Sequence, residues 1–255
     1  MSRTPITAGN WKMNKTVEEA SVFAEALLAG LPGMDGIEVI ICPPFTALYP
    51  LSQKCAGSPV QIAPQNMHWE AKGAFTGEIS AGMIQECHCH YVVLGHSERR
   101  HIFRETSEEI GKKVKAALDA HLCPILCVGE TIEEREVGKT EQIIKEQLLL
   151  GLTSVSPEKA SQVVVAYEPV WAIGTGKAAT PDDAHFVISY IRQFIGDEYG
   201  PVVAEAVRIL YGGSVTPDNV YDFMKDPDID GTLVGGASLD PAKFLKIIQE
   251  SRRAK

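Results

Sequence analysis

Short runs of apolar residues recur along the chain, and most are followed by a stretch whose apolar positions fall on one side of a helix. The runs are continuously apolar, which predicts strands of a parallel sheet that is covered by helices. Eight runs occur at an average spacing of about 32 residues, near the size of one strand–helix repeat. They are Ile6–Gly9, Ile37–Cys42, Val60–Ala63, Tyr91–Leu94, Pro124–Val128, Val163–Tyr167, Arg208–Tyr211 and Gly231–Val234.

The segments between these runs carry signals for helix starts. A threonine followed three residues later by a glutamate forms a capping box, in which each residue satisfies a backbone N–H of the other. This pattern occurs at Thr16–Glu19, Thr106–Glu109 and Thr131–Glu134. A cap residue before a proline at the first helical position is a second start signal. It occurs at Thr180-Pro181, Thr216-Pro217 and Asp240-Pro241.

Eight alternating units favour an α/β fold of the closed (β/α)8 barrel type, with eight parallel strands inside an outer ring of helices. A length of 255 residues without a linker or a shift in composition predicts one barrel domain over residues 1–255. The least regular segment, Gln65–Ser80, is polar, rich in glycine and longer than a connector requires. Such loops are often functional, and partner binding is one candidate role.

Composition narrows the class of protein. A net charge of −9 makes nucleic acid an unfavourable partner. The N-terminus has no signal peptide, and no apolar run approaches the roughly 18 residues of a membrane span. The six cysteines do not suggest a disulfide framework in a chain of this length. We therefore expect a reduced, cytoplasmic protein that binds neither nucleic acid nor membrane.

The residues that follow the strands are the candidates for chemistry, because a barrel carries its active site on these loops. The first strand is followed by Asn10 and Lys12, the fourth by His96 and Glu98, and the sixth by Glu168. Lys12 could be an ordinary surface lysine, and His96 could be a core histidine bonded to backbone. A helix start at His96 would disfavour a positive imidazole, because backbone N–H groups gather there.

Glu168 stands alone among apolar and turn residues. It follows a β-branched strand, and Pro169 and a glycine-bearing segment with Trp171 come directly after it. A carboxylate at a strand end, under a loop that could close, is a way to shield a base from water. A glutamate that merely caps a loop or pairs with a lysine fits this segment equally well.

Two glycine turns end the last two strands, at Gly212-Gly213-Ser214 and Gly235-Gly236. Exposed backbone N–H groups in such turns favour an anion, most often phosphate. The alternative is a pair of tight turns that need a positive φ. Their place after strands seven and eight matches the usual phosphate position of a barrel and favours binding.

With these residues in place, the chain resembles the triosephosphate isomerase family. Six motifs carry the resemblance, in family order and over nearly the whole chain. They are Gly9–Asn14 (GNWKMN), Gly73–Ser80 (GAFTGEIS), Gly95–Arg100 (GHSERR), Tyr167–Gly176 (YEPVWAIGTG), Tyr211–Val215 (YGGSV) and Leu233–Ser238 (LVGGAS).

The resemblance implies a TIM barrel isomerase of glycolysis and gluconeogenesis that needs neither cofactor nor metal. Its reaction would interconvert dihydroxyacetone phosphate and D-glyceraldehyde 3-phosphate by proton transfer through an enediolate. By the resemblance, Glu168 moves the proton between two carbons and neutral His96 donates to the enediolate oxygens. Asn10 and Lys12 would bind substrate and stabilise its negative charge, and Glu98 is a weaker catalytic candidate beside Lys12.

The resemblance also implies a phosphate site, a lid and a partner. Backbone N–H groups would hold the phosphate at Gly174, Ser214, Gly235 and Gly236. The segment from Pro169 to Ala179 would be the lid. The Gln65–Ser80 loop would form a homodimer by entering a second subunit beside its Lys12 region, with Thr76 supporting the partner's site.

Two alternatives remain to be weighed against the isomerase. One is an aldolase-type barrel enzyme in which Lys12 forms a Schiff base. The other is a non-catalytic barrel scaffold.

Two metal-like motifs are disfavoured. Adjacent ligands in Cys87–His90 would point to opposite faces of a strand. In Asp226–Gly231, which begins like a calcium loop, the twelfth position is Ala237 rather than glutamate.

Overall fold

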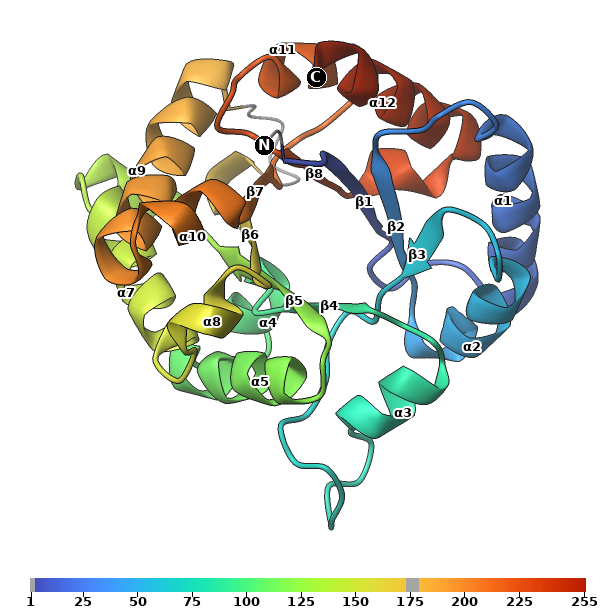
Figure 1. Cartoon of the computed structure of the whole chain (residues 1–255), viewed down its shortest axis with the longest axis horizontal. Coiled ribbons are helices and arrows are strands. Elements are labelled where there is room, and N and C mark those ends of the chain that lie inside the picture. The colour runs from blue at the N-terminus through green and yellow to red at the C-terminus, as the bar shows by residue number, and fades with distance from the viewer. Residues whose placement is uncertain (1–2, 173–178) are drawn as a thin grey trace.

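The barrel strands lie where the apolar runs predict them. The computed structural model describes residues 3–172 and 179–255, and Figure 1 shows the strands as a central ring. The strands are β1 (Ile6–Asn10), β2 (Glu38–Cys42), β3 (Val60–Ile62), β4 (Tyr91–Leu94), β5 (Cys123–Val128), β6 (Val164–Tyr167), β7 (Arg208–Tyr211) and β8 (Gly231–Val234). Each of the eight predictions is confirmed to within a residue at either end.

The strands form one parallel sheet in the order β3-β2-β1-β8-β7-β6-β5-β4. The two ends of this order meet where the backbone N–H of Val93 in β4 donates to the carbonyl of Pro64, 2.9 Å away, just after β3. This bond brings the sheet close to full closure. The predicted (β/α)8 barrel with eight parallel strands is therefore confirmed.

Side chains alternate between the barrel interior and the layer beneath the helices. Ile6, Ala8 and Ile40 belong to a buried cluster that consists of residues on or next to the strands. Val39 and Ile41, one position along, belong to a second cluster that includes the apolar faces of the helices. Since both faces of the sheet are buried, the strands read as unbroken apolar runs.

Helices surround the barrel (Figure 1). They are α1 (Val17–Gly30), α2 (Phe45–Lys54), α3 (Ala81–Glu86), α4 (Ser97–His101), α5 (Ser107–Asp119), α6 (Ile132–Glu136), α7 (Thr140–Leu152), α8 (Pro157–Ala160), α9 (Pro181–Tyr199), α10 (Pro201–Ala206), α11 (Val220–Met224) and α12 (Pro241–Ala254), with short 3-10 helices η1 (Val170–Ala172) and η2 (Gly236–Leu239). The three predicted capping boxes are present at Thr16, Thr106 and Thr131. The starts at Thr180 and Asp240 are also confirmed.

The helix start predicted at Thr216-Pro217 is wrong. The side chain of Asn219 accepts the Thr216 N–H at 2.8 Å and donates to the Ser214 carbonyl at 2.9 Å. Residues 217–219 form a turn, and α11 begins only at Val220. Asn219 is the N-cap residue of α11 instead, and its side chain is bonded back to the preceding loop and makes no cap bond to the helix.

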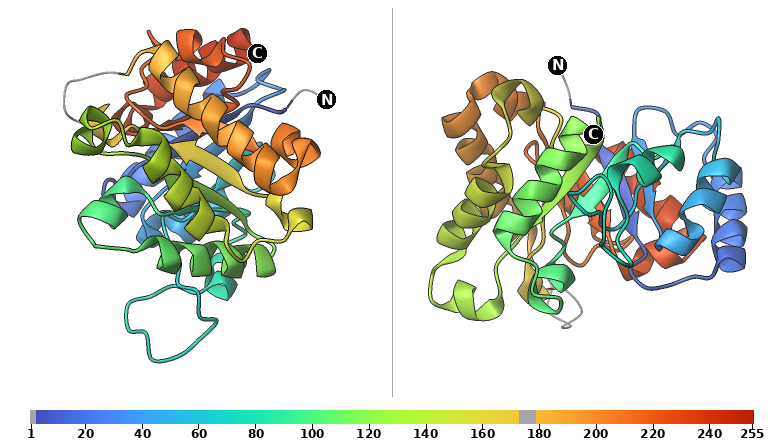
Figure 2. Two further views of the ribbon diagram at one scale, coloured as in Figure 1. Left: turned by 90° about the vertical axis from the view of Figure 1, so that its left-hand side faces the viewer. Right: turned by 90° about the horizontal axis from the view of Figure 1, so that it is seen from below.

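The Gln65–Ser80 loop extends away from the barrel in Figure 1 and in the left view of Figure 2. It contains neither helix nor strand along its length. At its base, Gln65 Nε2 donates to the carbonyls of Lys12 and Cys42, at 2.9 and 2.8 Å. Among the helices of the described residues, none has the length and apolar character to cross a membrane.

Candidate active site

The carboxyl ends of the strands surround a cavity of about 30 Å³. The residues around it come from five different strand ends, which parallel strands place at the same edge of a barrel. The lining residues are Asn10, Lys12, His96, Glu168, Gly212, Gly213, Leu233 and Gly235. Four of the five predicted catalytic candidates therefore converge, although up to 158 residues separate them in sequence (168 minus 10).

Glu168 follows β6 directly and is buried, with 2% of its surface exposed. One carboxylate oxygen, Oε2, accepts the Ser97 N–H at 3.0 Å, and the other lies 2.9 Å from His96 Nε2. Burial raises the pKa of Glu168, but His96 and the Ser97 N–H outweigh it and hold the pKa below the ordinary value of 4.5. The carboxylate is therefore charged at neutral pH and available to accept a proton.

Two glycines make room for Glu168. A Cβ at Gly129, directly after β5, would lie 1.8 Å from the Glu168 carbonyl oxygen. A Cβ at Gly212, directly after β7, would lie 2.9 Å from Glu168 Cγ. The sequence predicts the Gly212 turn, but the contact of either glycine with Glu168 was not predicted. The available signal was a glycine at the end of each strand that flanks β6.

His96 is the N-cap residue of α4, as its neighbours predicted. Its Nδ1 accepts the Glu98 backbone N–H at 3.2 Å, so the ring proton lies on Nε2, which faces Glu168. Burial lowers the pKa of His96, and the adjacent Glu168 carboxylate raises it above the ordinary 6.5. The Glu98 N–H opposes a second ring proton, because a protonated Nδ1 could not accept it.

Lys12 adopts a left-handed backbone conformation, with a φ of 54°. Its backbone N–H donates to Asn10 Oδ1 at 3.0 Å, and its Nζ lies 2.7 Å from Glu98 Oε1. Glu98 does not line the small cavity. It lines a neighbouring pocket of about 290 Å³ instead, so the structure joins Glu98 to Lys12 and keeps it away from Glu168.

The predicted phosphate residues divide into three groups. Gly235 lines the cavity, while Ser214 and Gly236 are exposed and do not. Gly212 and Gly213 line it in place of Ser214. Gly174 lies outside the described residues, and so does most of the predicted lid.

The described start of the predicted lid is tied to a buried acid that sequence analysis did not single out. Glu130 is fully buried, and it accepts hydrogen bonds from Trp171 Nε1 at 3.0 Å and from the Tyr167 hydroxyl at 3.2 Å. The guanidinium of Arg135 stacks over the Trp171 ring at 4.5 Å and also contacts Asp183 at the start of α9. In the sequence, the only signal for this role of Glu130 is the position of an acidic residue two residues after a buried strand.

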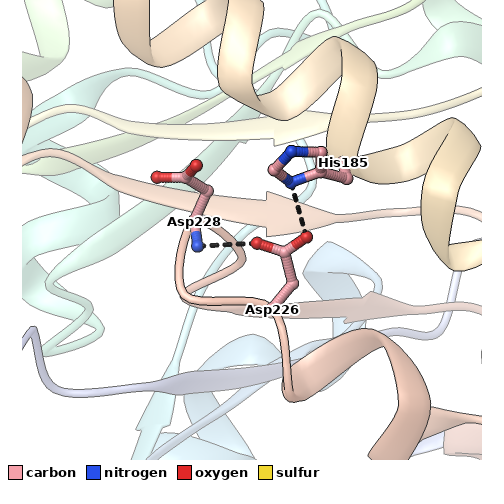
Figure 3. Close-up of side chains that lie close together, drawn as sticks. All are labelled: His185, Asp226 and Asp228. Atoms are coloured by element: carbon pink, nitrogen blue, oxygen red, sulfur yellow. Dashed lines mark hydrogen bonds and ion pairs between the residues drawn. The ribbon is translucent and has the colours of Figure 1, made fainter.

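One group of described residues has the spacing of metal ligands, namely His185, Asp226 and Asp228 (Figure 3). Asp226 accepts from His185 Nδ1 at 2.7 Å and from the Asp228 backbone N–H at 2.8 Å. The Asp228 carboxylate lies 2.8 Å from Arg192 Nε. Protein donors thus already bind both carboxylates, and this group serves to hold α9 against the turn before β8.

Comparison with known proteins agrees with the geometry. The sequence profile of the family described as Triosephosphate isomerase matches residues 5–251. A triosephosphate isomerase from Endomicrobium trichonymphae is 53% identical over 250 residues, which cover 98% of this chain and 100% of the relative. Those from Carboxydothermus hydrogenoformans (51% over 249 residues, 98% and 99% covered) and Symbiobacterium thermophilum (49% over 253 residues, 99% of each covered) are similar. The chain therefore belongs to the triosephosphate isomerase family of enzymes.

Proposed function

We propose that this chain interconverts dihydroxyacetone phosphate and D-glyceraldehyde 3-phosphate, a reaction of glycolysis and gluconeogenesis. One observation carries the proposal. A buried carboxylate, Glu168, lies 2.9 Å from the protonated nitrogen of His96 in a cavity that Lys12 and Asn10 also line. The two sugars are isomers, so a base that moves one proton and a donor that serves two oxygens can account for the whole reaction.

In the proposed mechanism, Glu168 removes a proton from the carbon beside the carbonyl and returns it to the neighbouring carbon. His96 Nε2–H donates to the enediolate oxygens as negative charge develops on them. A placed base contributes roughly 10²–10⁴ in rate, and each fixed donor about 10²–10³. Since Glu168 and His96 touch in this structure, the carboxylate must turn aside when the substrate enters.

Lys12 and Asn10 would stabilise the charge of the enediolate and the phosphate. Glu98 binds the Lys12 ammonium from outside the cavity, which supports a role in orienting Lys12. Backbone N–H groups at Gly235 and at the Gly212-Gly213 turn are the described candidates for the phosphate site. Ser214, Gly236 and Gly174 stay proposed phosphate residues on the strength of the family motif.

The contact between Lys12 and Glu98 also bears on the aldolase alternative. An ammonium held 2.7 Å from a carboxylate is not the free amine that Schiff-base formation needs. The isomerase is therefore the better account of Lys12. Borohydride added with substrate would trap a covalent adduct in an aldolase, and we expect none here.

We also propose a single-domain chain that works in the cytoplasm as a homodimer joined through the Gln65–Ser80 loop. The loop projects from the barrel and carries an exposed Phe75 near its end. A pocket of about 290 Å³ beside Lys12 is lined by exposed side chains of Met13 and Phe103 and could receive the loop of a second copy. Thr76 would then lie at the partner's site.

The decisive experiment is a coupled assay with glyceraldehyde 3-phosphate, repeated with 2-phosphoglycolate as a competitive inhibitor. The Glu168→Asp variant is the matched test, because it keeps the charge and draws the carboxylate back by about 1 Å. A shift of this size should cost on the order of 10²-fold in kcat. No activity in the parent chain would refute the proposed reaction, and an unchanged rate in the variant would remove Glu168 as the base.

A further inference from the structure

The Gln65–Ser80 loop, here called the arm, is built around a stack of rings. The His68 ring packs against the Trp69 ring, with centroids 4.2 Å apart and planes 25° apart. It also packs against Phe75, at 4.3 Å and 33°. The ammonium of Lys112 on α5 lies 5.2 Å from the Trp69 centroid. His68 is therefore a central layer between the barrel side of the arm and its tip.

His68 also makes one hydrogen bond across the arm and one to its own side of it. Its backbone N–H donates to the Ile79 carbonyl at 2.8 Å, and its Nδ1 accepts the Glu70 N–H at 3.0 Å. Only 8% of the His68 surface is exposed, although residues 70–78 around it are exposed. A buried histidine with stacking and hydrogen-bond contacts is unusual in a loop that has no helix or strand.

The tip of the arm is shaped to keep Phe75 on this stack. Gly73 has a φ of +146°, and a Cβ at this position would lie 2.9 Å from Phe75 Cε2. The Glu78 N–H donates to the Phe75 carbonyl at 3.0 Å and closes a turn around Thr76. Ring packing and turn geometry therefore fix the segment that carries Thr76.

The base of the arm is fixed to the candidate active site. Gln65 binds the carbonyl of Lys12, and Asn66 Oδ1 accepts from the buried ammonium of Lys113 at 2.9 Å. The base of the arm is thus bonded directly to the backbone of Lys12. The ring stack of His68, Trp69 and Phe75 lies between this base and the turn at the tip.

We propose that His68 is a positioning residue that holds the arm in its docking conformation before a second copy of the chain arrives. The inference rests on the proposed homodimer. Docking an arm that is already ordered avoids the conformational entropy that a loose loop loses at an interface. An arm without the stack would have to order Trp69 and Phe75 during association, and binding would be weaker.

Three substitutions separate the contributions of the ring and of the acceptor. His68→Phe keeps a stacking ring and loses Nδ1, His68→Asn keeps an acceptor for the Glu70 N–H and loses the ring, and His68→Ala loses both. His90→Ala is the matched control, because His90 is an exposed histidine just before β4, at the opposite end of the barrel from the arm. None of these residues lines the small cavity.

Two measurements test the proposal. Fluorescence-detected sedimentation over serial dilution gives the dimer dissociation constant, and trypsin cleavage after the exposed Lys72 in dilute protein reports the order of the arm. We expect His68→Ala and His68→Asn to raise the dissociation constant about tenfold, as for ordering one or two side chains on docking, and to speed cleavage. His68→Phe should restore both values to near those of the parent chain, and kcat should be unchanged wherever the dimer is fully formed.

The possible failures are distinct. A parent chain that stays monomeric at high concentration would refute the homodimer and, with it, the docking role of His68. A dimeric parent whose dissociation constant and cleavage rate are matched by His68→Ala would refute the role of His68 alone. A loss of kcat at full dimer formation would show instead that His68 acts on the cavity.

Discussion

Replacing Gly212 with alanine tests whether the placement of Glu168 determines the rate. The new Cβ would lie 2.9 Å from Glu168 Cγ and 3.2 Å from the Tyr167 carbonyl oxygen. Ordinary contacts of this kind begin at 3.4 Å, so a shift of about 0.5 Å (3.4 minus 2.9) in the Glu168 side chain would restore one. The Gly212 N–H is bonded to the Tyr167 carbonyl at 2.7 Å, which limits relief by backbone movement.

A shift of this size has a predictable effect on proton transfer. A misplacement of 1 Å can cost about 10²-fold, so half of that distance should lower kcat by about tenfold. The coupled isomerase assay measures this directly, with circular dichroism to show that the variant is folded. Gly196→Ala is the matched control, because its Cβ would meet Ala204 at an ordinary 3.6 Å within α9. An unchanged kcat in folded Gly212→Ala would refute the reasoning.

Three further changes test other parts of the site and core. Lys12→Ala should lower kcat/KM for the phosphorylated substrate by about 10²–10³. Equal activity of the variant and the parent chain in the coupled assay would show that Lys12 contributes nothing to the rate. The folded-state pKa of Glu168 is lowered, so its ionisation stabilises the fold above the unfolded-state pKa near 4.5, and this contribution is lost as the pH falls further. In denaturant titrations, the unfolding free energy of the parent minus that of Glu168→Gln should fall as the pH drops below 4.5. It should also fall as the pH rises above 6.5, because Glu168 raises the pKa of His96 and the stability from that bound proton is then lost. A difference that did not change with pH would contradict this. Thr232→Val should stabilise the fold by about 1 kcal/mol, because the buried Thr232 hydroxyl finds no partner among the described residues, and a lower melting temperature would argue against this reading.

The strands could be predicted because burial on both faces leaves a run of apolar residues with no competing pattern. The predicted start of β5 is one residue late. Cys123 pairs with Tyr91 as the first residue of the strand, although the apolar run predicts a start at Pro124. Pairing depends on the neighbouring strand, which the local sequence does not contain. Thr216 failed for a similar reason, since the decisive contact was the side chain of Asn219.

The residue types of the site could also be predicted, because chemistry in a barrel follows the strand ends. What could not be predicted was how those residues touch. The Ser97 N–H reaches Glu168, 71 positions away, only because the loops after β4 and β6 come together above the barrel. Gly129 and Gly212 leave room for Glu168 because they follow the two strands that pair with β6. The ring stack of His68 likewise depends on how the arm folds.

These contacts suggest how the base would be activated within the proposed mechanism. In this structure both oxygens of Glu168 accept hydrogen bonds, from Ser97 and His96, and these bonds lower its pKa. A substrate oxygen that takes the His96 proton donor would remove one of these bonds at the moment when the carboxylate is needed. Burial then acts without that opposition and raises the pKa of Glu168, which makes it a stronger base. Substrate binding would in this way make the Glu168 carboxylate more basic. The His96 N–H would bond Glu168 before the substrate binds and a substrate oxygen afterwards.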